Sequence, residues 1–345
     1  MKIRASFLGV FVVALFFGAT SLGQTSKGYK IIDKIKIGGE GGWDYLLADA
    51  STHRLYVSHA TRVIVIDTKT DKVIGEIPNT NGVHGIALVP DLGRGYTSNG
   101  RDSSVTVFDL KTLKTITTIQ LNARNPDAII YDPYSHRVFT FNGRSDNTTA
   151  IDPKRNSVVG TLELGGKPEF AVADGHGKIF VNLEDKSMIA VFDSKNLKVL
   201  HRWSIAPGEE PSGLALDDAN HRLFSVCHNK MMTVIDAMSG KVVASVPIGS
   251  GVDAARYDPV THLAFASNGE GTLTVVREET PNKFSVVENV PTQRGCRTMA
   301  LDAKTHRVYL SGATFGPAPA PTPEHPRPRP SIEPGSFVVL VLEQM

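Results

Sequence analysis

The sequence predicts an all-β fold, a seven-bladed β-propeller, and three observations carry this prediction. A segment recurs seven times, with its central residues 40, 43, 42, 43, 41 and 44 positions apart. Each repeat alternates apolar and polar residues as half-buried strands do, and no repeat has a helical period. The last repeat lacks a fourth strand, while an unassigned strand-like stretch precedes the first repeat. A period near 42 residues with four strands per unit is typical of propeller blades.

Each repeat contributes its strands in the same order. A short apolar stretch such as GIALV at 85–89 comes first, and a second stretch such as RLYVS at 54–58 follows a turn. A third stretch ends in Asp in five repeats, as RVIVID does at Asp67, and a fourth begins after a polar turn, as KVIGEI does at 72–77. Two packed sandwiches would explain the length of 345 residues but not this period.

The chain ends predict how the ring closes. The seventh repeat stops after its third strand, SFVVLVL at 336–342, and YKIIDKIKI at 29–37 resembles the fourth strands elsewhere. We expect residues 29–37 to complete the last blade, so that a single propeller domain spans residues 29–344. Radial closure leaves few exposed sheet edges.

Composition and the N-terminus bear on location. Lys2 and Arg4 precede an eleven-residue apolar run, 7–17, and small residues precede Gln24, which is the pattern of a secretory signal peptide at 1–23. The run is too short to span the roughly 30 Å hydrocarbon core as a helix. We therefore expect cleavage near Gly23, a periplasmic or extracellular protein and no stable membrane insertion. The net charge of +2 falls to zero without Lys2 and Arg4, which argues against nucleic acid as a partner.

The second strands carry a family resemblance. Tyr56-Val57-Ser58-His59, Tyr96-Thr97-Ser98-Asn99 and Phe265-Ala266-Ser267-Asn268 resemble the Tyr-Val-Thr-Asn signature of the YVTN repeat, or YncE-like, propellers. The resemblance covers roughly residues 29–344. It implies an exported seven-bladed propeller and brings no catalytic motif, although some members of the family carry a DNA-binding label.

Two recurring polar patterns are interpreted as structural. Asp and His stand four residues apart between the first and second strands of five repeats: Asp49/His53, Asp132/His136, Asp217/His221, Asp258/His262 and Asp302/His306. Five copies at the repeat period indicate a turn rather than a catalytic dyad. The Asp that ends each third strand is expected to bond backbone N–H groups of the following turn.

Candidate ligand-binding residues come from positions that vary between repeats. The loop entering the innermost strand and the loop leaving the second strand should lie on one face of a propeller. An inner ring of side chains should therefore meet a second ring there. The inner ring is Asp44, His84, Asp127, Glu169, Ser212, Asp253 and Arg297, and the second is His59, Asn99, Asn142, Asn182, His228, Asn268 and Ser311.

The charged residues of the inner ring fall into two groups, one with an arginine and one without. Arg297 follows Asp253 and precedes Asp44 around a closed ring, so these three residues are expected to form one satisfied cluster. Asp127 and Glu169 have no Lys or Arg beside them in the inner ring, and two carboxylates about 4 Å apart repel by roughly 4 kcal/mol at an effective dielectric of 20. Protonation, a charged His84, water or a bound cation could relieve this repulsion. Our hypothesis is that blades 2 to 4 attract a cation or a cationic or polyhydroxylated ligand through His84, Asp127, Glu169, Asn142 and Asn182. Asp127 and Glu169 are the candidate ligands for a divalent ion such as Ca²⁺ or Mg²⁺.

The last repeat holds a proline-rich loop at 314–335 where other repeats have short loops. Its prolines favour an extended course. The loop is interpreted either as a solvated insertion or as a lid or docking arm using His325, Arg327 and Arg329. Cys227 and Cys296 belong to blades separated by another blade, so we expect no disulfide between them.

Two classes of function remain open. The first is a non-enzymatic monomeric platform that binds a protein, a glycan or a small ligand on its loop face. The second is a metal-assisted lactone hydrolase or lyase in which the inner-ring carboxylates hold the ion and His84 or His228 is the general base. DNA binding rests on the family label alone.

Overall fold

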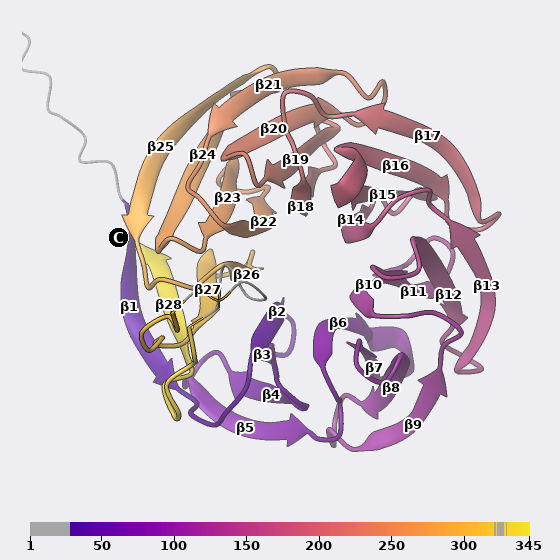
Figure 1. Cartoon of the computed structure of the whole chain (residues 1–345). Coiled ribbons are helices and arrows are strands. Elements are labelled where there is room, and N and C mark those ends of the chain that lie inside the picture. Colours follow the sequence, from indigo (N-terminus) through magenta and orange to yellow (C-terminus); the bar gives the residue numbers. More distant parts are fainter. Residues whose placement is uncertain (1–27, 321, 323–327, 329) are drawn as a thin grey trace, which may run out of the picture.

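Seven four-stranded antiparallel sheets form a closed ring in a computed structural model that describes residues 28–345, except 321, 323–327 and 329 (Figure 1). The signal peptide predicted at 1–23 lies outside the described residues. Blade 1 consists of β2 (Trp43–Asp49), β3 (Arg54–His59), β4 (Arg62–Asp67) and β5 (Lys72–Ile77). Blade 2 consists of β6 (Val83–Val89), the 3₁₀ turn η1 (Pro90–Leu92), β7 (Arg94–Asn99), β8 (Ser104–Asp109) and β9 (Thr115–Gln120).

Blades 3 to 6 repeat this order. Blade 3 is β10 (Pro126–Asp132), β11 (Arg137–Asn142), β12 (Asn147–Asp152) and β13 (Ser157–Glu163). Blade 4 is β14 (Pro168–Ala173), β15 (Lys178–Leu183), η2 (Glu184–Lys186), β16 (Met188–Asp193) and β17 (Lys198–Ser204). Blade 5 is β18 (Pro211–Asp217), β19 (Arg222–Cys227), β20 (Met231–Asp236) and β21 (Val242–Pro247). Blade 6 is β22 (Val252–Asp258), β23 (Leu263–Asn268), β24 (Thr272–Thr280) and β25 (Lys283–Pro291).

Blade 7 joins the two ends of the chain, as predicted. It consists of β26 (Thr298–Asp302), β27 (Arg307–Gly312), β28 (Val338–Gln344) and β1 (Tyr29–Lys36). β1 pairs antiparallel with β28, from Tyr29 opposite Gln344 to Lys36 opposite Val338. Tyr29 is buried and packs edge-on against Phe265 of blade 6 at 5.2 Å between ring centroids. The first strand therefore fastens the last blade to its neighbour as well as completing it.

The core lies between the blades. Each apolar cluster combines side chains of two or more sheets: for example, Leu46 and Val57 of blade 1 pack with Tyr309 and Val339 of blade 7. Alternation along the middle strands explains this arrangement, because successive side chains of a strand point to opposite faces of its sheet. Each sheet therefore buries apolar side chains against both neighbouring blades.

Arginine side chains bridge neighbouring blades on one face of the ring. In blades 1, 2, 3, 5 and 7, an arginine at the start of the second strand donates to a backbone carbonyl in the turn between the third and fourth strands of the next blade. The pairs are Arg54 with Leu110, Arg94 with Pro153, Arg137 with Ser194, Arg222 with Pro281 and Arg307 with Thr68. The pair from Arg307 to Thr68 joins blade 7 to blade 1.

The two structural turn predictions are confirmed. The histidines of the Asp-x-x-x-His turns have φ between 54° and 60°, the left-handed region. The preceding Asp accepts N–H groups of the same turn, as Asp302 does from Lys304 and Thr305. The Asp that ends each third strand does the same in the following hairpin, as Asp109 does from Lys111 and Thr112. Hydrogen bonds from Thr112 lower the pKa of Asp109, because they stabilise its ionised form.

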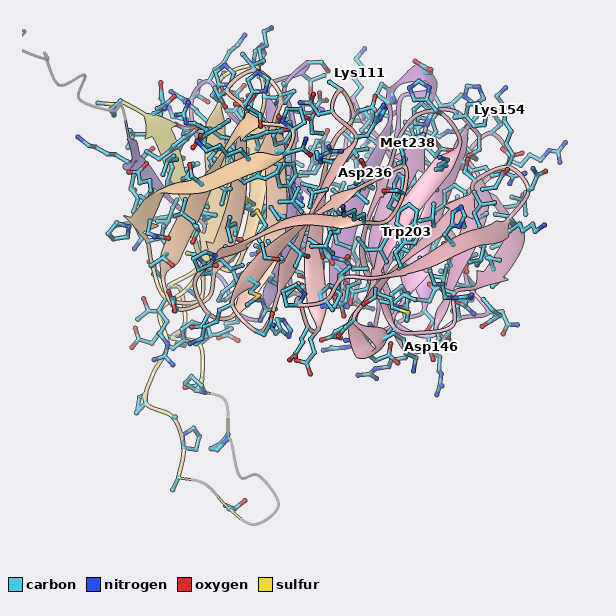
Figure 2. The ribbon with its side chains drawn as sticks, turned by 90° about the horizontal axis from the view of Figure 1, so that it is seen from above. Lys111, Asp146, Lys154, Trp203, Asp236 and Met238 are labelled. Atoms are coloured by element: carbon cyan, nitrogen blue, oxygen red, sulfur yellow. The ribbon has the colours of Figure 1, made fainter. Side chains whose placement is uncertain are left out.

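Two faces follow from this connectivity. The turn face carries the first-to-second and third-to-fourth strand turns, including Lys111 and Lys154 in Figure 2. The loop face carries the second-to-third strand loops, including Asp146, and the entries to the innermost strands. Figure 2 shows the described parts of the loop at 314–335 projecting from the same side as Asp146.

Candidate functional site

The inner ring lies where the innermost strands begin. Asp44, His84, Asp127, Glu169, Ser212 and Asp253 are each the second residue of the innermost strand of blades 1 to 6, and Arg297 directly precedes β26. In those six blades the pairing with the second strand shifts register at this position, as it does between Trp43 and Leu46. Such irregularities re-aim side chains and are common beside functional sites. The side chains meet across blade boundaries, as the following contacts show.

Asp44, His84 and Asp127 form a three-residue cluster from blades 1, 2 and 3. His84 Nδ1 lies 2.5 Å from Asp44 Oδ2 and 3.7 Å from Asp127 Oδ1. One ligand atom from each residue lies within 4.8 Å of the others. The three side chains are 17% to 26% exposed, so they remain accessible from the loop face. Asn125 donates to the other oxygen of Asp127 at 3.3 Å, and nothing in the sequence pattern had singled out Asn125.

The charges of this cluster favour a protonated His84. Burial opposes the charge on the ring, but the Asp127 carboxylate and the hydrogen bond to Asp44 outweigh it and raise the pKa of His84 to about 9. Burial raises the pKa of Asp127; the positive charge of His84 opposes that rise, while Asp44 and Asp253 add to it. The cluster therefore holds a proton at neutral pH in the place where a cation would also be stabilised.

Glu169 is not part of this cluster, because Lys167 pairs with it. Lys167 Nζ lies 2.6 Å from Glu169 Oε1 and also contacts Glu184. Burial and the charge of Asp127 raise the pKa of Glu169, and Lys167 opposes them. The sequence indicated no Lys or Arg beside Asp127 and Glu169 within the inner ring, and the basic residue that pairs with Glu169 comes from outside the ring. Lys167 stands two positions before Glu169, outside the aligned ring positions, and only that closeness in sequence could have indicated it.

The predicted cluster around Arg297 forms in part. Arg297 Nε lies 2.7 Å from Asp253 Oδ2, and Ser212 donates to the other Asp253 oxygen at 2.6 Å. Asp44, the third expected member, is bonded to His84 instead. The inner-ring residues of blades 5, 6 and 7 thus form a hydrogen-bonded cluster in which one arginine balances one carboxylate. The other inner-ring carboxylates lie in blades 1 to 4.

The second ring does not converge on the first, which corrects the sequence-based geometry. Asn142 is buried and donates to Asn147 and Thr149 within its own blade. Asn182 is buried and donates to the carbonyls of Ser212 and Gly213, joining blade 4 to blade 5.

The other members of the second ring lie in similar positions, except His228. Asn99, Asn268 and Ser311 are buried, and His59 stacks on Phe337 with 4.1 Å between ring centroids. His228 is exposed, with Nδ1 3.5 Å from Glu210 Oε2. The physical reason is that the end of a second strand lies inside its sheet, covered by neighbouring strands and blades.

A cavity of about 510 Å³ opens above the Asp44–His84–Asp127 cluster on the loop face. Its lining includes Asp44, His84 and Arg297, with Arg101 and Arg144 at the rim. Within the described part of the chain, Arg101 and Arg144 are exposed and form no ion pair. A basic rim therefore surrounds an acidic floor.

The proline-rich loop borders a second cavity, of about 520 Å³, beside the first. The loop ends are joined by a bridge between Phe315 and Ile332, and Trp43 packs against Phe315 at 6.0 Å. These aromatic residues line the second cavity together with Arg294 and Arg297. His325, Arg327 and Arg329, the predicted contacts of a docking arm, lie outside the described residues.

Cys227 and Cys296 are free and buried, in agreement with the expectation of no disulfide. Across the residues that the structure describes, no helix is long and apolar enough to cross a membrane.

Comparison with solved structures shows the fold alone. A chain of Kuenenia stuttgartiensis hydrazine synthase is 17% identical, covers 79% of this chain and 92% of its own, and has a TM-score of 0.69. A chain of a mitotic checkpoint complex is 12% identical, with 89% and 96% covered and a TM-score of 0.73. The WD40 repeats of RRP9 are 9% identical, with 91% and 97% covered and a TM-score of 0.74. No family model and no curated protein matches this sequence.

The protein is thus a seven-bladed β-propeller.

Proposed function

We propose that the loop face is a binding platform whose anchor is a divalent cation held by Asp44, His84 and Asp127. The observation that carries this proposal is that three ligand atoms from three different blades lie within 4.8 Å of one another. Two carboxylates and an imidazole on rigid strands can supply half of an octahedral coordination sphere. The remaining positions face the loop-face cavity.

The donor set changes the metal expected from the sequence. Asp127 and Glu169 alone suit Ca²⁺ or Mg²⁺, which prefer oxygen ligands. In the structure Glu169 is paired with Lys167, and the imidazole of His84 takes its place in the ligand set. Imidazole nitrogen suits transition metals and carboxylate suits Mn²⁺, so the mixed set favours a transition metal ion. We propose Mn²⁺ or Zn²⁺ as the ion.

The rim defines the kind of ligand. Arg101 and Arg144 face the same cavity as the cluster and have no carboxylate partner among the described residues. Arginine binds carboxylates in a bidentate manner. A ligand with carboxylate and hydroxyl oxygens, such as an acidic glycan or sugar acid, would bind the ion and the rim together.

The family resemblance and the predicted signal peptide support an exported protein of the YVTN, or YncE-like, type. In this proposal the platform works in the periplasm or outside the cell, where acidic glycans are accessible. Solved propellers that occur in multiprotein assemblies support a platform role, since one structural neighbour belongs to a mitotic checkpoint complex.

The enzymatic alternative needs a general base beside the ion. His84 holds a proton at neutral pH and bonds Asp44, while His228 lies at the surface beside Glu210. This arrangement favours binding over metal-assisted lactone hydrolysis. Lactone turnover by the Mn²⁺-loaded protein that disappears in His84→Gln would reverse this conclusion.

Isothermal titration of the metal-free protein with Mn²⁺ and Zn²⁺ tests the proposal. We expect one ion per chain, with at least tenfold weaker binding in Asp127→Asn and Asp44→Asn. Asp91→Asn, an exposed carboxylate on the turn face, is the matched control and should bind as the wild type does. Binding at pH 7 should release close to one proton, since the ion displaces the His84 proton. Equal binding by Asp127→Asn and the wild type would refute the site.

A further inference from the structure

The turn-face half of the central channel is a third cavity, separate from the loop-face site. It has a volume of about 490 Å³ and extends along β2, β6 and β10 from Tyr45 to Ser51. Aliphatic residues of these strands line its walls, among them Leu47, Ala87 and Ile130. It shares no lining residue with the cavity above the Asp44–His84–Asp127 cluster. Volumes of about 300–1,000 Å³ with mainly apolar walls are typical of small-molecule sites.

Three side chains close the inner end of this cavity. Tyr45 of blade 1 packs on Phe170 of blade 4 with ring centroids 5.3 Å apart. The guanidinium of Arg256, from blade 6, lies 4.7 Å from the centroid of the same Phe170 ring. The three residues come from opposite sides of the ring and form a layer across the channel, beneath the inner ring.

Arg256 is the unusual member of this layer. Its guanidinium donates to the carbonyl of Ala255 at 2.7 Å, and no described carboxylate forms an ion pair with it. Arg297, by contrast, has Asp253 as its acidic partner. A half-buried arginine ordinarily satisfies its five donors with carboxylate or carbonyl oxygens. Most donors of Arg256 have no partner among the described residues, and they lie at the end of a largely apolar cavity.

The charge states agree with this geometry. Burial lowers the pKa of Arg256 to about 10, so the guanidinium stays charged at neutral pH. The hydroxyl of Tyr45, which also lines the cavity, is the second donor at this end. That hydroxyl has no hydrogen-bond partner among the described residues. Two donors without an acceptor thus lie at one end of the cavity, and apolar walls lead away from them.

We propose that this half-channel binds a small amphipathic carboxylate, with its carboxylate on Arg256 and Tyr45 and its apolar body along β2, β6 and β10. Arg256 selects an anionic head group, because a neutral or cationic one would leave its guanidinium unpaired. Asp49 also lines the cavity, but it stands four residues farther along β2 than Tyr45, beside the apolar body of the ligand and not its head group. The apolar walls select a hydrocarbon body over a sugar, which distinguishes this site from the loop-face site. The site does not depend on a metal ion.

The test compares three probes of equal chain length by isothermal titration: octanoate, octanol and octylammonium. We expect octanoate to bind at least tenfold more tightly than octanol, and octylammonium not to bind. Arg256→Met should abolish this preference while keeping or improving octanol binding, which also shows that the variant is folded. Arg155→Met is the control, because its side chain is 79% exposed and lines neither this cavity nor the loop-face cavity, and it should leave octanoate binding unchanged.

Three results would overturn the proposal. The first is equal affinity for octanoate and octanol in the wild type, and the second is unchanged octanoate affinity in Arg256→Met. Absence of octanoate binding at millimolar concentration would also refute it, and would mean that Arg256 only stacks on Phe170. Addition of a chelator should not change octanoate binding, so this result is independent of the loop-face metal.

Discussion

His84 Nδ1 lies 2.5 Å from Asp44 Oδ2, although the two residues begin the innermost strands of different blades. The contact exists because both strands enter the channel from the same face and shift register at the same position. Asp127 approaches the same nitrogen from blade 3. One histidine therefore neutralises carboxylates from both of its neighbours, and its proton contributes to stability as well as to ligand binding.

The first prediction concerns the pH dependence of unfolding. The pKa of His84 is raised from 6.5 to about 9 in the folded protein, so its contribution is complete below pH 6.5 and disappears as the pH rises through 9. We expect the metal-free protein to lose on the order of 2 kcal/mol of unfolding free energy over that interval. His84→Gln should flatten this loss in guanidinium titrations at pH 6.5 and 9.5. His176→Gln, at an exposed position, should retain the wild-type dependence; a wild-type slope in His84→Gln would contradict the assignment.

The second prediction concerns the arginines that bridge blades. Arg222 is 8% exposed and donates to Pro281 O at 2.6 Å and to Asp236 Oδ2 at 2.8 Å. Arg222→Met would leave a carbonyl and a carboxylate without their partner. We expect a loss of about 2–4 kcal/mol in urea unfolding. Arg155→Met, whose side chain is 79% exposed, should change stability by less than about 0.5 kcal/mol. Similar effects in both variants would argue against a bridging role.

The third prediction concerns ring closure. Tyr29 packs on Phe265, donates its hydroxyl to His306 O at 3.1 Å and donates its N–H to Glu288 at 2.9 Å. Tyr29→Ala removes the ring contact and the hydroxyl bond together, so we expect about 3–5 kcal/mol of destabilisation. Lys30→Ala on the exposed side of the same strand is the control. Thermal melting of both variants checks the prediction, and equal melting temperatures would show that β1 contributes little to closure.

The fourth prediction concerns the two cysteines. Burial raises the pKa of Cys227 to about 11 and that of Cys296 to about 12. Since the thiolate is the reactive form, neither should react with a thiol reagent over minutes in the native protein. Both should react once guanidinium unfolds the chain. Rapid labelling of the native protein would mean that these strand ends open locally.

Much of the fold could be predicted because the sequence repeats with a period near 42 residues. Blade number, strand order and the role of residues 29–37 follow from alternation and from a missing fourth strand. The turn roles of Asp109 and His306 follow from their recurrence, since a feature present in five of the seven repeats reflects a need that the blades share.

The site was harder to predict because its contacts cross blade boundaries. The inner ring positions follow from the repeat alignment, but which carboxylate pairs with which base depends on side-chain reach. Lys167 and Asn125 each stand two positions before an inner-ring residue, so an alignment of the ring positions does not include them. Asn142 was expected to face the ligand site, because a polar residue at the end of a strand is usually exposed. In the structure its side chain is buried and donates to Asn147 of the same blade. The position of Arg256 inside the channel could not be predicted from the sequence, since a single arginine on a strand is usually exposed to solvent.

The pairing of β1 with β28 also has a consequence for biosynthesis. Tyr29 is among the first residues of the described chain to be made, and its partner Gln344 is almost the last. The opening strand must wait, with Ile35 uncovered, until β28 has been translated. Blades 1 to 6 can form in turn as they emerge, but the hydrogen bonds between β1 and β28 form only after that. A chain released early would leave two complementary sheet edges open, and each could capture the matching edge of another copy.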